Sequence, residues 1–178
     1  MVSVVLSILI ISVYSLSSSH SIILEITLDR ELPAVLGEVA NDIDAQLLMP
    51  ITIAKVMANN VDYQDVIRSG DKADNHQKII RYLKNIKQNF DTITAFLVSS
   101  ESGRYFSANG LAKTISKSDP KDQWFYNFMA SGKDYELSLD IDESNQIPTL
   151  FINYLMRVDG RPSAVTGVGL SLASAGFK

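Results

Sequence analysis

The sequence predicts an α+β domain in which helices precede a mostly antiparallel sheet. Two observations lead to this prediction. Between Leu32 and Met57, apolar residues recur at intervals of three and four, which is the period of a helix with one buried face. After residue 92, short β-type runs follow one another, and Asp159-Gly160 between the last two is a strong signal for a hairpin turn.

The first helix is expected to run from Asp29 to Asn60. Pro50 falls inside it and is expected to kink or divide it, because proline lacks the N–H group that a helix interior uses. The apolar stripe that defines this helix comprises Leu32, Val35, Leu36, Val39, Ile43, Leu47, Ile51, Ala54 and Met57.

A second helix is expected from Asn75 to Phe90, with Asp74 or Asn75 capping its first N–H groups. The polar segment 61–74 between the two helices contains Gly70 and is interpreted as a loop. The inner face of the second helix would carry Ile79, Ile80, Leu83, Ile86 and Phe90.

Five strands are expected to form one antiparallel sheet after the second helix. Ser102-Gly103 would connect the first two as a hairpin. Residues 108–123 are interpreted as a long polar connection, and Trp124–Ala130 as a short amphipathic helix or turn. The expected strands are Ile93–Ser99, Arg104–Ser107, Tyr135–Asp140, Thr149–Val158 and Ser163–Leu172.

The N-terminal segment Met1–Leu16 carries no charge, and counting on to Ile26 reaches the about 20 residues that span a bilayer. A membrane anchor, a cleaved signal peptide and a buried helix are the three interpretations. A basic n-region and a small-residue cleavage site are missing, which favours the anchor over the signal peptide. We therefore expect residues 1–28 to be a truncated anchor with the start of a stalk, and residues 29–178 to form the folded domain.

Composition argues against several classes of function. The net charge of −4 comes from 16 basic and 20 acidic residues, and this balance leaves no electrostatic footprint for nucleic acid. The absence of cysteine excludes disulfides and thiolate chemistry. The acidic run of Asp140, Asp142 and Glu143 lacks the glycine of a calcium loop and is interpreted as a solvated turn. We therefore expect no metal, no cofactor and no enzyme.

The order of these segments resembles that of Cache domains, the PAS-like extracytoplasmic sensors of chemoreceptors, histidine kinases and diguanylate cyclases. The resemblance covers about residues 32–172. It rests on LLMPITIAKVMANN (47–60), IIRYLKNI (79–86), DPKDQWFYNF (119–128), YELSLDID (135–142), LFINYLMRVDGR (150–161) and TGVGLSL (166–172).

The resemblance implies a PAS-like fold with a central five-stranded antiparallel sheet, a long N-terminal helix and a second helix. It also implies a fragment of a homodimeric receptor in the bacterial inner membrane. The sensor domain would lie in the periplasm, bind a small molecule and pass ligand occupancy through the N-terminal helix to a cytoplasmic output.

In Cache domains the ligand pocket lies on the inner face of the sheet and is closed by the loop before the third strand. The resemblance therefore implies six candidate ligand-binding residues: Tyr105, Asp122, Trp124, Tyr126, Tyr135 and Asn153. Aromatic walls with a few polar groups suit small ligands. The alternative is that Trp124, with Phe125 and Phe128, only fills the core.

Amino-acid-binding Cache domains resemble one another in an arginine two residues before the tryptophan and an aspartate on the last strand. Here Asp122 stands in the arginine position and Gly169 in the aspartate position. We therefore expect a neutral or cationic ligand rather than a carboxylate. Two other functions stay open: a ligand-free structural, dimerising or partner-docking domain, and a membrane-tethered hydrolase, which the missing catalytic clusters disfavour.

Overall fold

The structure, a computed structural model, describes residues 32–70, 72–142 and 145–171, with side chains from residue 45 onward. The chain divides into two units between Leu47 and Leu48. The described part of the first unit is the N-terminal half of helix α2 (Leu32–Ala58), and the second unit contains everything that follows. Across the three described ranges, no helix has both the length and the hydropathy needed to cross a membrane. The predicted anchor, residues 1–28, lies outside them.

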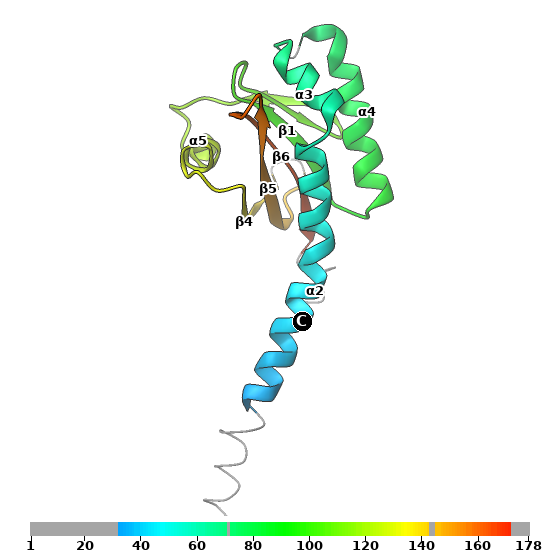
Figure 1. Ribbon diagram of the computed structural model, residues 1–178, viewed down its shortest axis with the longest axis vertical. Coiled ribbons are helices and arrows are strands. Elements are labelled where there is room, and N and C mark those ends of the chain that lie inside the picture. The colour runs from blue at the N-terminus through cyan, green and yellow to red at the C-terminus, as the bar shows by residue number, and fades with distance from the viewer. Residues whose placement is uncertain (1–31, 71, 143–144, 172–178) are drawn as a thin grey trace, which may run out of the picture. The chain divides into compact units, whose positions relative to one another are not determined.

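The second unit is built on a six-stranded sheet in the order β3-β2-β1-β6-β5-β4, in which every neighbouring pair is antiparallel (Figure 1). The central strand β1 is buried along its whole length, because both faces of the sheet are covered there. The strands are β1 (Thr94–Ser99), β2 (Arg104–Ser107), β3 (Gly110–Thr114), β4 (Tyr135–Ile141), β5 (Pro148–Val158) and β6 (Arg161–Ser171).

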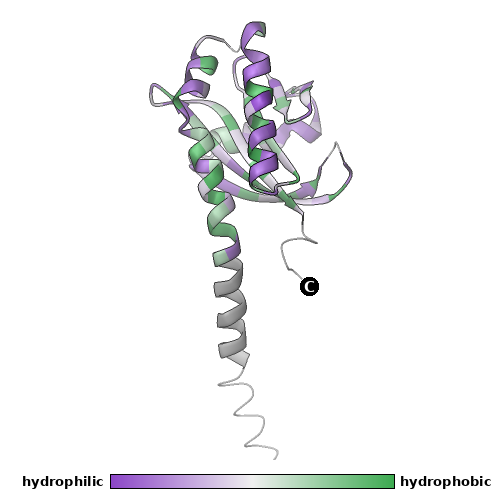
Figure 2. Cartoon of the chain, turned by 90° about the vertical axis from the view of Figure 1, so that its right-hand side faces the viewer, coloured by the Kyte–Doolittle hydropathy of each residue, from purple (hydrophilic) through white to green (hydrophobic). Residues whose placement is uncertain are grey.

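One face of the sheet packs against helices. The C-terminal part of α2, α3 (Val61–Arg68) and α4 (Ala73–Asn89) bury their apolar residues there, and hydrophilic residues face outward on α4 (Figure 2). This core includes Ala54, Met57, Ile67, Ile79, Leu83, Leu97, Phe106, Ile152, Met156 and Val168.

The opposite face carries the 3-10 turn η2 (Pro120–Asp122) and helix α5 (Gln123–Ala130). Successive residues of a strand point to opposite faces, so Phe96 and Val98 of β1 face this second core while Ala95 and Leu97 face the first. The second core contains Phe96, Val98, Ile115, Phe125, Phe128, Leu155 and Val165.

The predicted α+β fold with an antiparallel sheet and both hairpins is confirmed, but two segments were interpreted wrongly. Residues 61–68, predicted as loop, form α3. The side chain of Asn60 caps this helix by accepting from the Tyr63 N–H at 3.2 Å, and Tyr63, Val66 and Ile67 are buried. These residues have helical spacing, but one turn of periodicity amid polar residues is a weak signal.

The second error is the strand count, since residues 110–114 of the predicted connection form the edge strand β3. Most of this strand is exposed, so it lacks the apolar alternation that marks a strand in sequence. Two details of the helices also differ from prediction. Pro50 does not divide α2, so of its two expected effects the kink stays a prediction. Helix α4 begins after Lys72 without a side-chain cap from Asp74 or Asn75.

Candidate functional site

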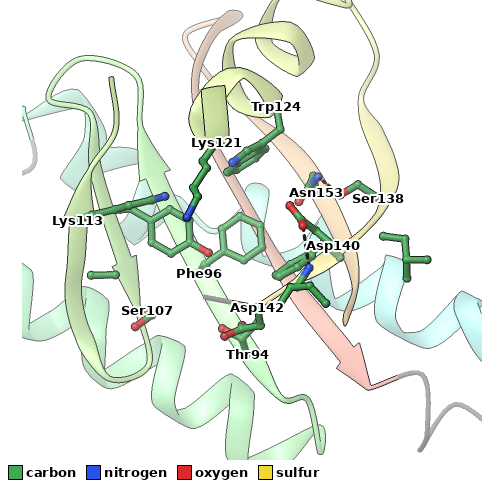
Figure 3. Close-up of a pocket in the computed structure, with 15 residues that line it drawn as sticks. Thr94, Phe96, Ser107, Lys113, Lys121, Trp124, Ser138, Asp140, Asp142 and Asn153 are labelled. Carbon is green, nitrogen blue, oxygen red and sulfur yellow. Dashed lines mark hydrogen bonds between the residues drawn. The ribbon is translucent and has the colours of Figure 1, made fainter. Parts of the chain in front are cut away.

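A cavity of about 330 Å³ lies between the sheet and the η2–α5 segment (Figure 3). Pockets of this size accommodate small molecules. The lining combines four aromatic rings with polar and charged groups from five of the strands. The lining residues are Thr94, Phe96, Tyr105, Ser107, Ala112, Lys113, Lys121, Trp124, Ser138, Leu139, Asp140, Ile141, Asp142, Phe151 and Asn153.

Phe96 is the centre of the aromatic floor. Its ring stacks on Tyr105 at 5.6 Å between centroids and meets Trp124 and Phe151 edge to face at 6.1 and 6.2 Å. Such edge and stacked arrangements are the favourable ones for aromatic pairs. The floor is therefore fixed by ring packing from β1, β2, β5 and α5, and it offers flat apolar surface to a ligand.

Glycine on β6 makes this floor possible. Gly167 pairs with Phe96 of β1 on one side and with Asn153 of β5 on the other. A Cβ atom at position 167 would lie 3.1 Å from Cζ of Phe96 and 1.9 Å from the carbonyl oxygen of Ile152. Only glycine fits the present geometry there, and the absence of a side chain leaves space beside the Phe96 ring between β1 and β5.

Asp122 holds the η2–α5 segment, the roof of the cavity, to the sheet. Its carboxylate is buried, and Oδ2 accepts a hydrogen bond of 2.9 Å from the backbone N–H of Ser116. Oδ1 lies 2.9 Å from the ammonium of Lys113 on β3, and among the described residues it accepts no other hydrogen bond. The ion pair ties η2 to the edge strand and keeps the Lys113 ammonium at the cavity wall.

Two charged walls follow from this arrangement. Lys113 and Lys121 bring ammonium groups to the cavity from β3 and η2, whereas Asp140 and Asp142 bring carboxylates from β4 and the residue after it. Asn153 reaches the cavity from β5 and donates a 3.1 Å hydrogen bond to Oγ of Ser138 (Figure 3). The cavity can thus offer positive charge, negative charge and amide groups to one small molecule.

No protein-family model matches the chain. Solved structures do. The sensor domain of the histidine kinase DctB from V. cholerae matches with a TM-score of 0.66 at 16% identity, over 85% of this chain and 58% of that one. The ligand-binding domain of the Pseudomonas fluorescens chemoreceptor CtaA, in complex with L-alanine, matches with a TM-score of 0.58 at 19% identity, over 83% of this chain and 61% of that one.

The ligand-binding domain of the Pseudomonas aeruginosa PAO1 chemoreceptor PctB, in complex with L-Arg, matches with a TM-score of 0.55 at 19% identity. This match covers 75% of the present chain and 53% of PctB's domain. The chain has a PAS-like Cache fold. It spans little more than half the length of these solved sensor domains.

Three of the six residues that the Cache resemblance singled out line the cavity. Trp124 contributes an aromatic wall, Tyr105 stacks on the floor, and Asn153 supplies an amide. Trp124 also packs against the second core, so it both lines the cavity and fills part of the core. Phe125 and Phe128 are buried core residues, as the alternative interpretation had it.

The other three residues are not part of the cavity lining. Asp122 is engaged with Lys113 and Ser116, Tyr126 lies beneath the Lys117 ammonium at 5.5 Å, and Tyr135 stacks on Tyr154 at 5.9 Å. Tyr135 is also half exposed on the edge strand of the Cache sheet. A direct role of these three residues in binding stays a prediction.

Sequence reasoning did not place four charged residues in the cavity that line it within the described part of the chain: Lys113, Lys121, Asp140 and Asp142. Lys113 lies on the strand that was interpreted as a loop, and Lys121 stands in a polar run with nothing to mark it. The expectation of a solvated acidic turn is wrong for Asp142, which is buried and accepts a 3.2 Å hydrogen bond from the Asn145 N–H. Within the described ranges of the chain, no cluster of three or more histidine or acidic residues is arranged to hold a metal ion.

Proposed function

We propose that this chain is the extracytoplasmic small-molecule-sensing domain of a membrane-bound bacterial signalling receptor. The observation that carries the proposal is the open cavity beside Trp124, on the sheet face that α5 covers. The solved domains that share its fold are described as sensor or ligand-binding domains. Several of them are in complex with an amino acid. The Cache fold and a cavity of ligand size therefore support the same function.

Ligand contacts would come from both sides of the cavity. Trp124 and Phe96 offer apolar faces, and Tyr105 and Asn153 offer hydrogen-bonding groups that fix orientation. Asp122 would act indirectly, because it holds Lys113 at the wall and anchors the turn that leads into α5. A ligand that binds better when α5 sits close to the sheet would stabilise that arrangement by its difference in affinity.

The proposed signal leaves the domain through α2. Residues Ile53, Ala54 and Met57 of this helix are buried on the sheet, so a change in sheet packing acts on it directly. Leu48, Met49 and Val56 are exposed on its outer surface at intervals that suit packing against a second helix. We propose that α2 leads toward an inner-membrane anchor, with the domain in the periplasm, and that it pairs with a second copy.

The alternative function, a structural or partner-docking domain without a ligand, predicts a cavity filled by its own side chains. The unfilled cavity favours sensing over this alternative.

Mass spectrometry of small molecules that co-purify with the 178-residue chain tests the proposal. A molecule released from the wild-type protein on denaturation is expected to be missing from Trp124→Ala, because the substitution removes one wall of the cavity. Phe90→Ala is the matched control, since Phe90 is an exposed aromatic outside the cavity. A thermal-shift screen of amines, carboxylates and amino acids complements this measurement. If nothing co-purifies and no compound raises the melting temperature, the sensing proposal is wrong.

A further inference from the structure

The cavity has opposite charges at its two ends. In Figure 3 the ammonium groups of Lys113 and Lys121 lie on one side of Phe96, and the carboxylate of Asp140 lies on the other. Between them the floor is aromatic, with the Tyr105 phenol beside Phe96. Asp142 is a further carboxylate of the lining, and it accepts a hydrogen bond of 3.2 Å from the Asn145 N–H. A ligand that fills this cavity therefore meets positive charge at one end and negative charge at the other.

Lys121 is the cation that is available to a ligand. Lys113 is already paired with the buried carboxylate of Asp122 at 2.9 Å. Lys121 follows the helix-start proline of η2, and its backbone N–H is held by Asp119 at 2.9 Å. Its side chain points into the cavity (Figure 3), and within the described part of the chain its ammonium has no acidic partner.

Asp140 is the matching anion at the other end. It lies on β4, one residue before that strand ends, and Oδ1 accepts a 2.7 Å hydrogen bond from the adjacent Ile141 N–H. That bond orients the carboxylate and leaves it able to accept from a ligand. No basic side chain of the described residues forms an ion pair with it.

The separation of the two ends selects the length of the ligand. Phe96 lies on β1, and three strand intervals separate β1 from β4 in the order β1-β6-β5-β4. At about 4.8 Å an interval, the two strands are roughly 14 Å apart along the sheet. The Lys121 and Asp140 side chains extend into the space above the sheet, so their charged groups are closer together than the strands, with the Phe96 ring between them (Figure 3). Both charges of an α-amino acid are bonded to one carbon, so a molecule of that kind reaches one end only.

We propose, on the basis of the proposed sensing function, that the ligand is a linear dipolar molecule whose carboxylate and ammonium stand at opposite ends of a short apolar chain. Lys121 takes the carboxylate and Asp140 takes the ammonium, while the chain lies on Phe96 and Trp124. This assignment replaces the expectation that the ligand carries no carboxylate and is bound by Asp122, because the cavity supplies a cation that the sequence did not reveal.

The test uses 5-aminopentanoate, with pentanoate and pentylamine as probes that carry one charge each. Titration calorimetry on the 178-residue chain is expected to give 5-aminopentanoate an affinity at least about tenfold higher than either single-charge probe, since a hydrogen bond to a charged group is of that order. Glycine, in which both charges flank one carbon, is expected to bind no better than the single-charge probes.

Two charge-removing variants assign the ends. Lys121→Gln should weaken 5-aminopentanoate and pentanoate about tenfold and leave pentylamine unchanged, and Asp140→Asn should do the reverse. Lys117→Gln, before η2, and Glu136→Gln, on β4, are controls outside the lining, and both should bind like wild type. Circular dichroism verifies that each variant is folded.

The outcomes separate this inference from the proposed function. If pentylamine or pentanoate binds as well as 5-aminopentanoate, or if both charge variants bind it normally, the dipolar assignment is wrong while the cavity remains a binding site. If none of the probes binds, the dipolar assignment is also wrong. The sensing function is then judged on the co-purified molecule and on the Trp124→Ala variant.

Discussion

Removing the Asp122 carboxylate is expected to destabilise the domain rather than merely alter binding. Asp122→Ala eliminates the acceptor of the Ser116 N–H and removes the Asp122 carboxylate from the Lys113 ammonium. A lost hydrogen bond to a buried carboxylate costs about 1–3 kcal/mol. The ion pair adds a value between those of exposed and buried pairs, because the two side chains are 28% and 3% exposed. We expect a total loss of about 3 kcal/mol in the free energy of unfolding.

Urea unfolding followed by circular dichroism measures this loss, and a double-mutant cycle isolates the ion pair. Asp122→Ala, Lys113→Met and the double variant are expected to give a coupling energy of about 1–2 kcal/mol. Asp122→Asn should retain part of the stability, because its amide oxygen can still accept from Ser116.

The exposed pair of Arg157 and Asp134, 3.4 Å apart, provides the control cycle. Its coupling is expected to be below about 0.5 kcal/mol, as for other exposed pairs. If Asp122→Ala costs less than about 1 kcal/mol, or if the Lys113 cycle shows no more coupling than the control, Asp122 does not lock the roof to the sheet and the reasoning fails.

Three further predictions concern the sheet and its surroundings. Gly167→Ala is expected to lower the free energy of unfolding by more than about 3 kcal/mol, because the backbone carbonyl of Ile152 must move. Gly160→Ala should lower it by only about 1 kcal/mol, because the position has open space and only its φ of 76° disfavours alanine. Equal losses in urea unfolding would contradict this prediction. The Arg68 guanidinium lowers the pKa of Asp159 from its ordinary value of 3.8. Wild type should therefore be more stable than Asp159→Asn at neutral pH and lose this advantage as the pH falls below 3.8. A stability difference that persists at pH 2 would contradict a contribution from the Arg68–Asp159 ion pair. Burial raises the pKa of Tyr63, so wild type should lose stability as the pH rises above 10. Tyr63→Phe should lose less stability over that range, although at pH 7 it is expected to be about 1 kcal/mol less stable because the hydrogen bond to Ile79 is missing. Equal losses of stability above pH 10 in the two proteins would refute this prediction.

Elements with strong local signals could be predicted from the sequence. A few neighbouring residues are enough to indicate the stripe on α2, the inner face of α4 and the Asp159-Gly160 turn. The positive φ of both turn residues confirms the hairpin. The prediction failed where the signal was short or absent. α3 has one turn of apolar spacing, and β3 is an exposed edge strand that is stable because β2 pairs with it.

The residues of the candidate site also divide into those with a recognisable signal in the sequence and those without one. Trp124, Tyr105 and Asn153 were found because aromatic and amide residues follow the Cache resemblance. Lys113, Lys121 and Asp140 were not, because a lysine or aspartate in a polar segment has the same local pattern whether it faces water or a cavity. Asp122 was expected to face the ligand, and its burial against Lys113 became evident only when β3 was in place.

The sequence by itself determined the α+β class and the antiparallel pairing, since these depend on periodicity and turn residues close together in the chain. The Cache resemblance of the sequence implied the aromatic character of the site. Only the tertiary structure decided where the charges of the cavity lie. Lys121 and Asp140 are brought to its two ends by a sheet that places β4 and β3 at opposite edges, and by an ion pair between Asp122 and Lys113 that holds η2 in place. Such placement depends on contacts between segments distant in sequence, which local patterns do not encode.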